Sequence, residues 1–536
     1  MIDTRMKNNL IFSELSADEQ LKWFDLKEKK FLHNIDSFYY SVKLVNDFTE
    51  DSTDKACLRF REYFKERKDG CSVFTEIPLH IPECDVQLNY MPFQKFGFFY
   101  DVKIQCPDMF DIYFASSVPK GADGEKSVTS EIIVQLRSYM LWQYGATKAF
   151  EYSYDVLKEI CNYFGFGVSE VKENRVDFCW HSNYLQNPDK FFAPDNMAKR
   201  IVTTLGRKDR KGVNCHYDIT PTREVEIDYI SIGNRDKNKK VYLRIYMKSK
   251  EVVEKGYKPW FFTEWLQNGM INQYDFYVYQ TAFIKHSWNY IDTARLEFYA
   301  EYGKDEVYRK ECAAIVSGEK KHDAAYITKL ADKLTPRVTI ITNVEYETSR
   351  KFSKSIEFKQ FRNNVDKNEC ERIYDYLDNR RLIAEYLTRG VFRLTEPTDT
   401  DINISRAENC AFWEALRSAK MIDVKKSPKN LKLTRDYTRN LNKEVVKNRI
   451  KSSIVTYTIY DRGFEHINSM DDAIQFICNL NDNDIHDMDI IRGKRKQQLN
   501  KMIYQMPTNG SERRNVIILD NDTGEIYDTS TNRSGD

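Results

Sequence analysis

Three short stretches of this chain alternate strictly between apolar and polar residues: 175–181 (RVDFCWH), 242–248 (YLRIYMK) and 295–299 (RLEFY). Successive side chains of a β-strand point to opposite faces of the sheet. If the three stretches are strands of one sheet, its polar face carries these residues: Arg175, Asp177, Cys179, His181, Tyr242, Arg244, Tyr246, Lys248, Arg295, Glu297 and Tyr299. The pattern therefore predicts a sheet with one apolar face and one face of charged residues, tyrosines and a histidine.

The remaining periodicity predicts an α+β fold. Strands are expected near 35–45, 96–104, 111–116, 131–141, 225–232, 240–248 and 338–346, with a hairpin around the turn at 233–238. Helical periodicity occurs at 55–68, 146–164, 261–286 and 305–335, and dominates beyond residue 368. This alternation indicates an α+β fold with a central antiparallel sheet and crossing helices, followed by a mainly helical, basic C-terminal region.

With 536 residues, the chain is too long for one ordinary core. We expect an N-terminal helical segment at 1–32, a catalytic domain at 33–305 and a connecting helix and strand at 306–367. A basic helical domain at 368–505, expected to bind DNA, and a polar tail at 506–536 would complete the chain.

A formal net charge of only +1 means that any affinity for nucleic acid must come from local basic patches. The strongest patch lies at 425–451, which contains ten Lys and Arg residues and only two acidic residues. Basic turns at 206–212 and 234–240 are further candidates. The candidate DNA-binding residues are Arg175, Arg295, Arg207, Arg210, Lys211, Arg235, Lys425, Lys426, Lys429, Lys432, Arg435 and Arg439. The alternative is that these runs are simply solvated surface.

Eleven cysteines without CxxC or zinc-type spacing fit reduced thiols in the cytoplasm. The first 20 residues lack the apolar core of a signal peptide, and the chain has no run of 18 apolar residues. We therefore expect a cytoplasmic protein without a membrane partner.

The polar face holds the groups needed to cut a phosphodiester with a tyrosine. Tyr246 is the candidate nucleophile, and Arg244 and Lys248 beside it could bind phosphate. Asp177 and Glu297 could hold a divalent metal ion, with His181 as a further ligand or a base. The alternative is a solvated sheet face on which Arg175–Asp177 and Arg295–Glu297 form ordinary salt bridges.

The segment 230–251 (ISIGNRDKNKKVYLRIYMKSKE) resembles the replication-initiation-factor family, which comprises rolling-circle initiators of plasmids and filamentous phages and related conjugative relaxases. The resemblance places the family's nucleophile on Tyr246 and matches its Arg-Leu-Asp and Arg-x-Glu strands to residues 175–177 and 295–297. It implies that Asp177 and Glu297 bind the metal. Where family members carry a second Asp, this chain has His181, a nitrogen ligand that favours Mn²⁺ over Mg²⁺.

The resemblance implies a metal-dependent, DNA-nicking rolling-circle replication initiator that works through a covalent 5′-phosphotyrosyl intermediate. Its partners would be single-stranded and duplex origin DNA, a host helicase and a host polymerase. Whether the protein forms a homodimer stays open. Two alternatives also stay open: a non-catalytic protein that binds single-stranded nucleic acid on the same sheet, and a conjugative relaxase with the same chemistry.

Overall fold

A computed structural model gives the structure of the protein. The structure describes residues 23–24, 29–45, 54–69, 76–77, 88–95, 100–106, 109–115, 130–185, 187–205, 213–220, 225–233, 240–255, 258–353, 369–396 and 406–422, with short pieces at 450, 453, 517–519 and 526–528. Most of the N-terminal helical segment expected at 1–32, most of the basic run at 425–451 and most of the polar tail lie outside these residues. The last two residues of that segment, 31–32, belong to a strand.

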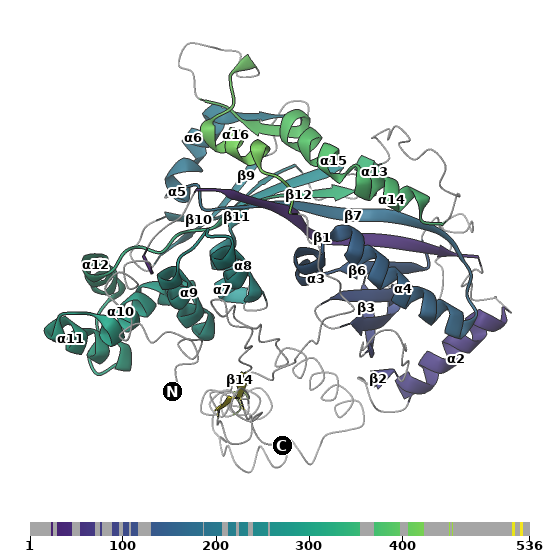
Figure 1. Cartoon of the computed structure of the whole chain (residues 1–536), viewed down its shortest axis with the longest axis horizontal. Helices are drawn as coiled ribbons and strands as arrows, with labels where there is room; N and C mark the ends of the chain where they lie inside the picture. The colour runs from purple at the N-terminus through teal and green to yellow at the C-terminus, as the bar shows by residue number, and fades with distance from the viewer. Residues whose placement is uncertain are drawn as a thin grey trace, which may run out of the picture.

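An antiparallel sheet of eleven strands runs through the described part of the molecule (Figure 1), in the order β2-β3-β4-β5-β6-β1-β7-β12-β11-β10-β9. Its strands are β1 Phe31–Leu44, β2 Glu76–Ile77, β3 Leu88–Lys95, β4 Tyr100–Cys106, β5 Phe110–Phe114, β6 Ile132–Leu136, β7 Val168–Ser182, β9 Val213–Ile219, β10 Val225–Ile232, β11 Val241–Met247 and β12 Thr342–Ser349. Two further sheets have two strands each: β8 Ile201–Thr203 with β13 Phe392–Leu394, and β14 Ile517–Leu519 with β15 Ile526–Asp528. The long strands β1 and β7 form the centre of the sheet.

Helices cover the sheet on both faces. They are α2 Lys55–Asp69, α3 Ser138–Tyr144, α4 Ala146–Phe164, α5 Pro188–Phe191, α6 Pro194–Arg200, α7 Lys248–Lys255, α8 Trp260–Gln267, α9 Gln273–Lys285, α10 Ile291–Tyr302, α11 Glu306–Ser317, α12 Ala324–Leu334, α13 Arg350–Ser353, α14 Glu371–Asp378, α15 Arg380–Tyr386 and α16 Ala411–Ser418. In Figure 1, α13 to α16 lie along the upper side of the long strands, and α7 to α12 gather at the lower left.

The alternation in β7, β11 and β12 separates two hydrophobic cores. Val176, Phe178 and Trp180 of β7 point into the larger core, together with residues of α4, α14 and α16. On the opposite face, Cys179 joins a second core, which is built mainly from the aromatic residues of α8 and α9. The polar face expected from the sequence is therefore covered by helices over part of its area.

These observations confirm the α+β fold and the antiparallel sheet. The helix at 146–164 ends as expected, because Gly165 adopts the left-handed conformation with φ 89° and donates its N–H to the last turn. The strand expected at 131–141 is shorter, because β6 ends at Leu136 and α3 begins at Ser138. The predicted domain boundaries stay predictions, although α14 and α16 share the larger core with β1 and β7.

The strand predicted at 295–299 is wrong, since these residues belong to α10. Ile291, Ala294 and Phe298 lie at helical spacing and pack into the core on the α8–α9 side, whereas Leu296 packs on the other side against α11 and α12. A helix buried on two sides gives a short alternating pattern that five residues cannot distinguish from a strand.

Within the part of the chain that the structure describes, no helix combines the length and apolarity needed to cross a membrane. The cysteines in that part are free thiols.

Candidate active site

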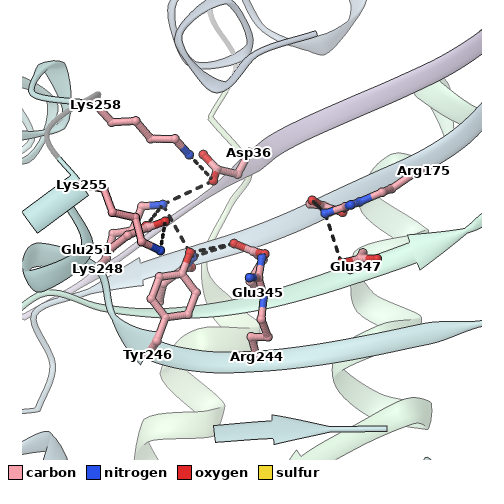
Figure 2. A network of polar contacts seen from close by, with 12 residues as sticks. Asp36, Arg175, Arg244, Tyr246, Lys248, Glu251, Lys255, Lys258, Glu345 and Glu347 are labelled. Atoms are coloured by element: carbon pink, nitrogen blue, oxygen red, sulfur yellow. Dashed lines mark hydrogen bonds and ion pairs between the residues drawn. The ribbon is translucent and has the colours of Figure 1, made fainter. Parts of the chain in front are cut away.

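The hydroxyl of Tyr246 is the centre of a polar network on one face of β11 and β12 (Figure 2). It donates a hydrogen bond of 2.8 Å to Oε2 of Glu345 and accepts one of 2.9 Å from Nδ2 of Asn343. The ammonium of Lys248 donates a third, at 3.3 Å. A phenol is thus held between a carboxylate that can take its proton and a cation.

Strand register explains why these groups meet. In the β11–β12 pair, Tyr246 lies opposite Asn343 and Arg244 lies opposite Glu345. Side chains directly opposite on one face of an antiparallel pair lie about 5 Å apart at Cβ. The Arg244 guanidinium forms a short ion pair with Oε1 of Glu345, which leaves Oε2 for the Tyr246 hydroxyl.

Lys248 is a fully buried cation at the start of α7, with 0% of its side chain exposed. Its Nζ lies 2.7 Å from Oε2 of Glu251 and 3.4 Å from Oδ2 of Asp36, and Lys258 also reaches that Asp36 oxygen at 3.1 Å. Burial alone lowers the pKa of Lys248, but Asp36 and Glu251 outweigh it and raise this pKa well above the ordinary lysine value. Lys248 therefore stays charged.

Asp36 reaches this network because of a β-bulge in β1. The β1–β7 register shifts between Ile35 and Ser37, so Asp36 is the extra residue. Ile35 and Phe38 both point into the larger core. A bulge of this kind redirects a side chain locally without ending the strand. The bulge places the Asp36 carboxylate 3.4 Å from the ammonium of Lys248.

The phenol of Tyr246 keeps its proton at neutral pH. Burial raises the pKa of Tyr246 well above the ordinary tyrosine value, and the carboxylates of Glu251 and Glu345 raise it further. Lys248 and Arg244 oppose this shift. A base must therefore remove the proton as the phenol reacts, and the carboxylate of Glu345 already accepts the hydrogen bond.

A second cluster of charges lies further along the same face. Arg175 donates to both carboxylate oxygens of Asp177, at 2.9 and 2.6 Å, and lies 3.1 Å from Glu347. Burial raises the pKa of Asp177 to about 6, and this value reflects a balance between Arg175, which lowers it, and Glu345 and Glu347, which raise it.

The structure brings together the three residues expected to carry catalysis, Tyr246, Arg244 and Lys248, around Glu345. It does not bring together the three expected metal ligands. Glu297 lies on α10, not on the sheet. His181 lies on the expected face of β7, but it is completely buried.

His181 is enclosed by aromatic rings. Its Nδ1 accepts a hydrogen bond of 3.2 Å from the indole of Trp265, and its ring stacks on Trp142 and meets Phe261 edge-on. Burial and the nearby Lys248 lower the pKa of His181 well below the usual value, so the ring is neutral. It packs as a core histidine.

The expected donor set therefore does not fit a metal ion in this structure. Both carboxylate oxygens of Asp177 are occupied by Arg175, His181 packs among aromatic rings, and Glu297 belongs to another element. Among the described residues, no three His, Cys, Asp or Glu side chains are grouped so that they could share a metal ion.

Of the candidate DNA-binding residues, Arg175 is partly exposed, whereas Arg295 is buried. Arg295 pairs with Asp292 of its own helix at 2.7 Å and links α10 to α12 through Asp332 at 2.9 Å, which is a structural role. The remaining candidates lie outside the described residues: Arg207, Arg210, Lys211, Arg235, Lys425, Lys426, Lys429, Lys432, Arg435 and Arg439.

Sequence reasoning missed Glu345, Asn343, Glu347 and Asp36. The signal for the first three was present, because residues 343–347 alternate between polar residues and Val344 and Tyr346. That stretch overlaps the strand expected at 338–346, and its alternation puts Asn343, Glu345 and Glu347 on one face. Asp36 had no such signal, because the bulge interrupts the alternation of β1.

No family model and no curated protein matches this chain. Among solved structures, a rolling circle replication initiator protein from Geobacillus stearothermophilus aligns over 74% of this chain and 100% of its own, with 8% sequence identity and a TM-score of 0.33. A TM-score this low does not establish a common fold. The assignment of a function therefore depends on the side chains around Tyr246.

Proposed function

We propose that this protein nicks and rejoins single-stranded DNA through a covalent bond between Tyr246 and the 5′-phosphate of the cut strand. The observation that carries the proposal is the 2.8 Å hydrogen bond from the Tyr246 hydroxyl to Glu345, with Lys248 and Arg244 as cations on either side. A nucleophile, a base and positive charge are the three parts that such a reaction needs.

In the forward step, the phenol oxygen of Tyr246 attacks phosphorus while its proton passes to Glu345. The P–O3′ bond breaks, and O3′ takes a proton from solvent and becomes a free 3′-hydroxyl. In the reverse step, a 3′-hydroxyl attacks the phosphotyrosine and loses its proton to solvent, the bond between phosphorus and Tyr246 breaks, and the phenol recovers its proton from Glu345. The phosphodiester energy is conserved in the intermediate, so no ATP is needed.

The more specific proposal is a rolling-circle replication initiator. Its support is the sequence resemblance around residues 230–251, which places the family's nucleophile on Tyr246. In that role, the protein would bind origin DNA, and the 3′-hydroxyl would prime a host polymerase while a host helicase separates the strands.

The test is a covalent-adduct assay with Tyr246→Phe. A pool of random-sequence single-stranded oligonucleotides, labelled at the 3′ end, is incubated with the protein and separated on a denaturing gel. The label should migrate with the wild-type chain, because the 3′ fragment carries the phosphate that Tyr246 attacks. Tyr246→Phe should lose the adduct and keep DNA binding.

Tyr242→Phe is the matched control. Tyr242 precedes Tyr246 on the same face of β11 and lies opposite Glu347. This variant should form the adduct at the wild-type level. An adduct that persists in Tyr246→Phe would show that the nucleophile is another residue. DNA binding by the wild type without any adduct would favour a non-catalytic single-strand-binding protein.

A further inference from the structure

Every carboxylate around Tyr246 already has a cationic side chain as its partner. The five carboxylates are Asp36, Asp177, Glu251, Glu345 and Glu347, and the five cations are Arg175, Arg244, Lys248, Lys255 and Lys258. The formal charge is zero over all ten groups. The cluster around Tyr246 carries +1, and Asp177 and Glu347, which share Arg175, bring −1. Sites for hard divalent ions instead present uncompensated oxygen ligands to the ion. The cluster around Tyr246 therefore offers no excess negative charge to attract one.

Lys248 places a positive charge next to the oxygen that would attack the phosphate. Its Nζ lies 3.3 Å from the attacking phenol oxygen of Tyr246, and the carboxylates of Asp36 and Glu251 fix it there. A buried, fixed charge next to a reacting phosphate acts through a medium of low dielectric constant, so it stabilises developing negative charge more strongly than an exposed charge would.

Arg244 supplies a second fixed cation. Its guanidinium is bound to Glu345 and lies 5.7 Å from the centre of the Tyr246 ring. When Glu345 accepts the phenol proton it becomes neutral, and the charge of Arg244 is then no longer balanced by its partner. The positive potential of the site therefore increases in the same step in which negative charge builds up on the phosphate.

We propose that Lys248 and Arg244 take the place of a metal ion in this site, so that strand cleavage needs no divalent cation. This inference rests on the proposed function of Tyr246. It disagrees with the metal dependence that the sequence resemblance implies, and the reason is the pairing of each carboxylate with a side-chain cation.

The first experiment repeats the adduct assay with wild-type protein that has been dialysed against EDTA, with EDTA, Mg²⁺ or Mn²⁺ present during the reaction. The adduct should form at the same rate, to within about twofold, under all three conditions, whereas removal of an essential metal would abolish the adduct in EDTA. An adduct that forms with Mg²⁺ or Mn²⁺ and disappears in EDTA overturns the inference but leaves the nicking function intact. No adduct under any condition overturns both.

The second experiment measures metal binding without any reaction. Mn²⁺ is titrated into the full chain and followed by electron paramagnetic resonance. The signal should remain that of free Mn²⁺ up to about 1 mM, the weak end of protein sites for hard cations. One bound Mn²⁺ per chain that is lost in Glu345→Gln would overturn the inference.

The third experiment replaces Lys248 by Met, which removes the charge and keeps much of the chain length. The adduct rate should fall by about 10²–10³, the usual loss for one preorganised electrostatic group, and Mg²⁺ should not restore it. Lys248→Arg should recover part of the rate, and Lys310→Met on the exposed surface of α11 should match the wild type. Because Lys248→Met leaves two buried carboxylates less well paired, its thermal unfolding is measured alongside. A folded Lys248→Met variant with the wild-type rate would overturn the inference.

Discussion

In the proposed reaction, Glu345 is the residue on which proton transfer depends. The raised pKa of Tyr246 makes its phenolate a stronger nucleophile but a rarer one, so the reaction requires a base within hydrogen-bonding distance. We expect Glu345→Gln to lower the adduct rate by about 10²–10⁴, the usual contribution of a general base, because an amide cannot accept the proton. DNA affinity, measured by fluorescence anisotropy, should stay within a few-fold of wild type.

Glu297→Gln is the informative comparison. Glu297 matched the family's second acidic position in sequence, but it lies on α10 and not beside Tyr246. We expect this variant to form the adduct at the wild-type rate in the same assay. Loss of the adduct in Glu297→Gln together with full activity in Glu345→Gln would reverse the assignment of the two glutamates.

Asp177 should make the protein less stable as the pH rises. Its pKa is about 6 in the folded protein and 3.8 as the reference value, so the folded state favours the protonated carboxyl. The stability that this group contributes is fully present below pH 3.8 and is lost as the pH rises through about 6. The loss is at most about 3 kcal/mol, from the size of the shift.

Urea unfolding of the wild type and Asp177→Asn at several values between pH 4 and pH 7 measures this effect. The variant cannot ionise, so its stability relative to the wild type should increase with pH across this range. Comparing how the free energy of unfolding changes with pH in the two proteins removes the pH-independent loss of stability that results from weakening the Arg175–Asp177 pair. Parallel stability curves for the two proteins would contradict the raised pKa.

At the scale of elements, the bulge in β1 places the carboxylate of Asp36 among the charged side chains around Lys248. Burial alone raises the pKa of Asp36, but Lys248 and Lys258 outweigh it and hold this pKa well below its usual range. Asp36→Ala would leave the buried ammonium of Lys248 with one carboxylate fewer. We expect it to cost about 3–5 kcal/mol of unfolding free energy, as for other broken buried ion pairs.

Thermal and urea unfolding at neutral pH measure this cost, with Lys43→Ala, an exposed substitution on the same strand, as control. Because the pKa of Asp36 is lowered on folding, its contribution is complete above the reference value of 3.8 and is lost as the pH falls through the lower folded value. The difference between wild type and Asp36→Ala should therefore shrink in acid. A loss below 1 kcal/mol at neutral pH would show that Lys248 does not depend on Asp36.

The elements that were predictable from the sequence are those with long, regular patterns. β7 and the β10–β11 hairpin combine alternation with clear turns, and α4 combines helical spacing with a terminal glycine. The α10 segment was misassigned because its helix is buried on two sides, which is a tertiary effect. The packing of His181 under α8 could not be read from β7, since the aromatic residues that enclose it come from other parts of the chain.

At the scale of the whole molecule, the sheet and the helices beyond residue 368 share one hydrophobic core. Tyr376 of α14 lies 6.4 Å from Phe38 of β1, measured between ring centres, and Phe412 of α16 lies 5.1 Å from Phe31. The domain boundary predicted at residue 368 stays a prediction. From the shared core we expect the stability of the Tyr246 site to depend on helices more than a hundred residues away in the chain.

Trp413→Ala tests this dependence. Trp413 of α16 is completely buried, packs edge-on against Phe392 of β13 and donates its indole N–H to the carbonyl of Thr388. Its removal should cost about 3–5 kcal/mol, as for other large aromatic residues in cores. If the sheet and α14–α16 unfold as one unit, hydrogen exchange in β7 and β11 should accelerate as much as in α16, because opening of either part exposes the same core. Exchange that accelerates only in α13–α16 would mean that residues beyond 368 unfold as an independent domain, and adduct formation by Tyr246 would then survive temperatures at which α16 has already opened.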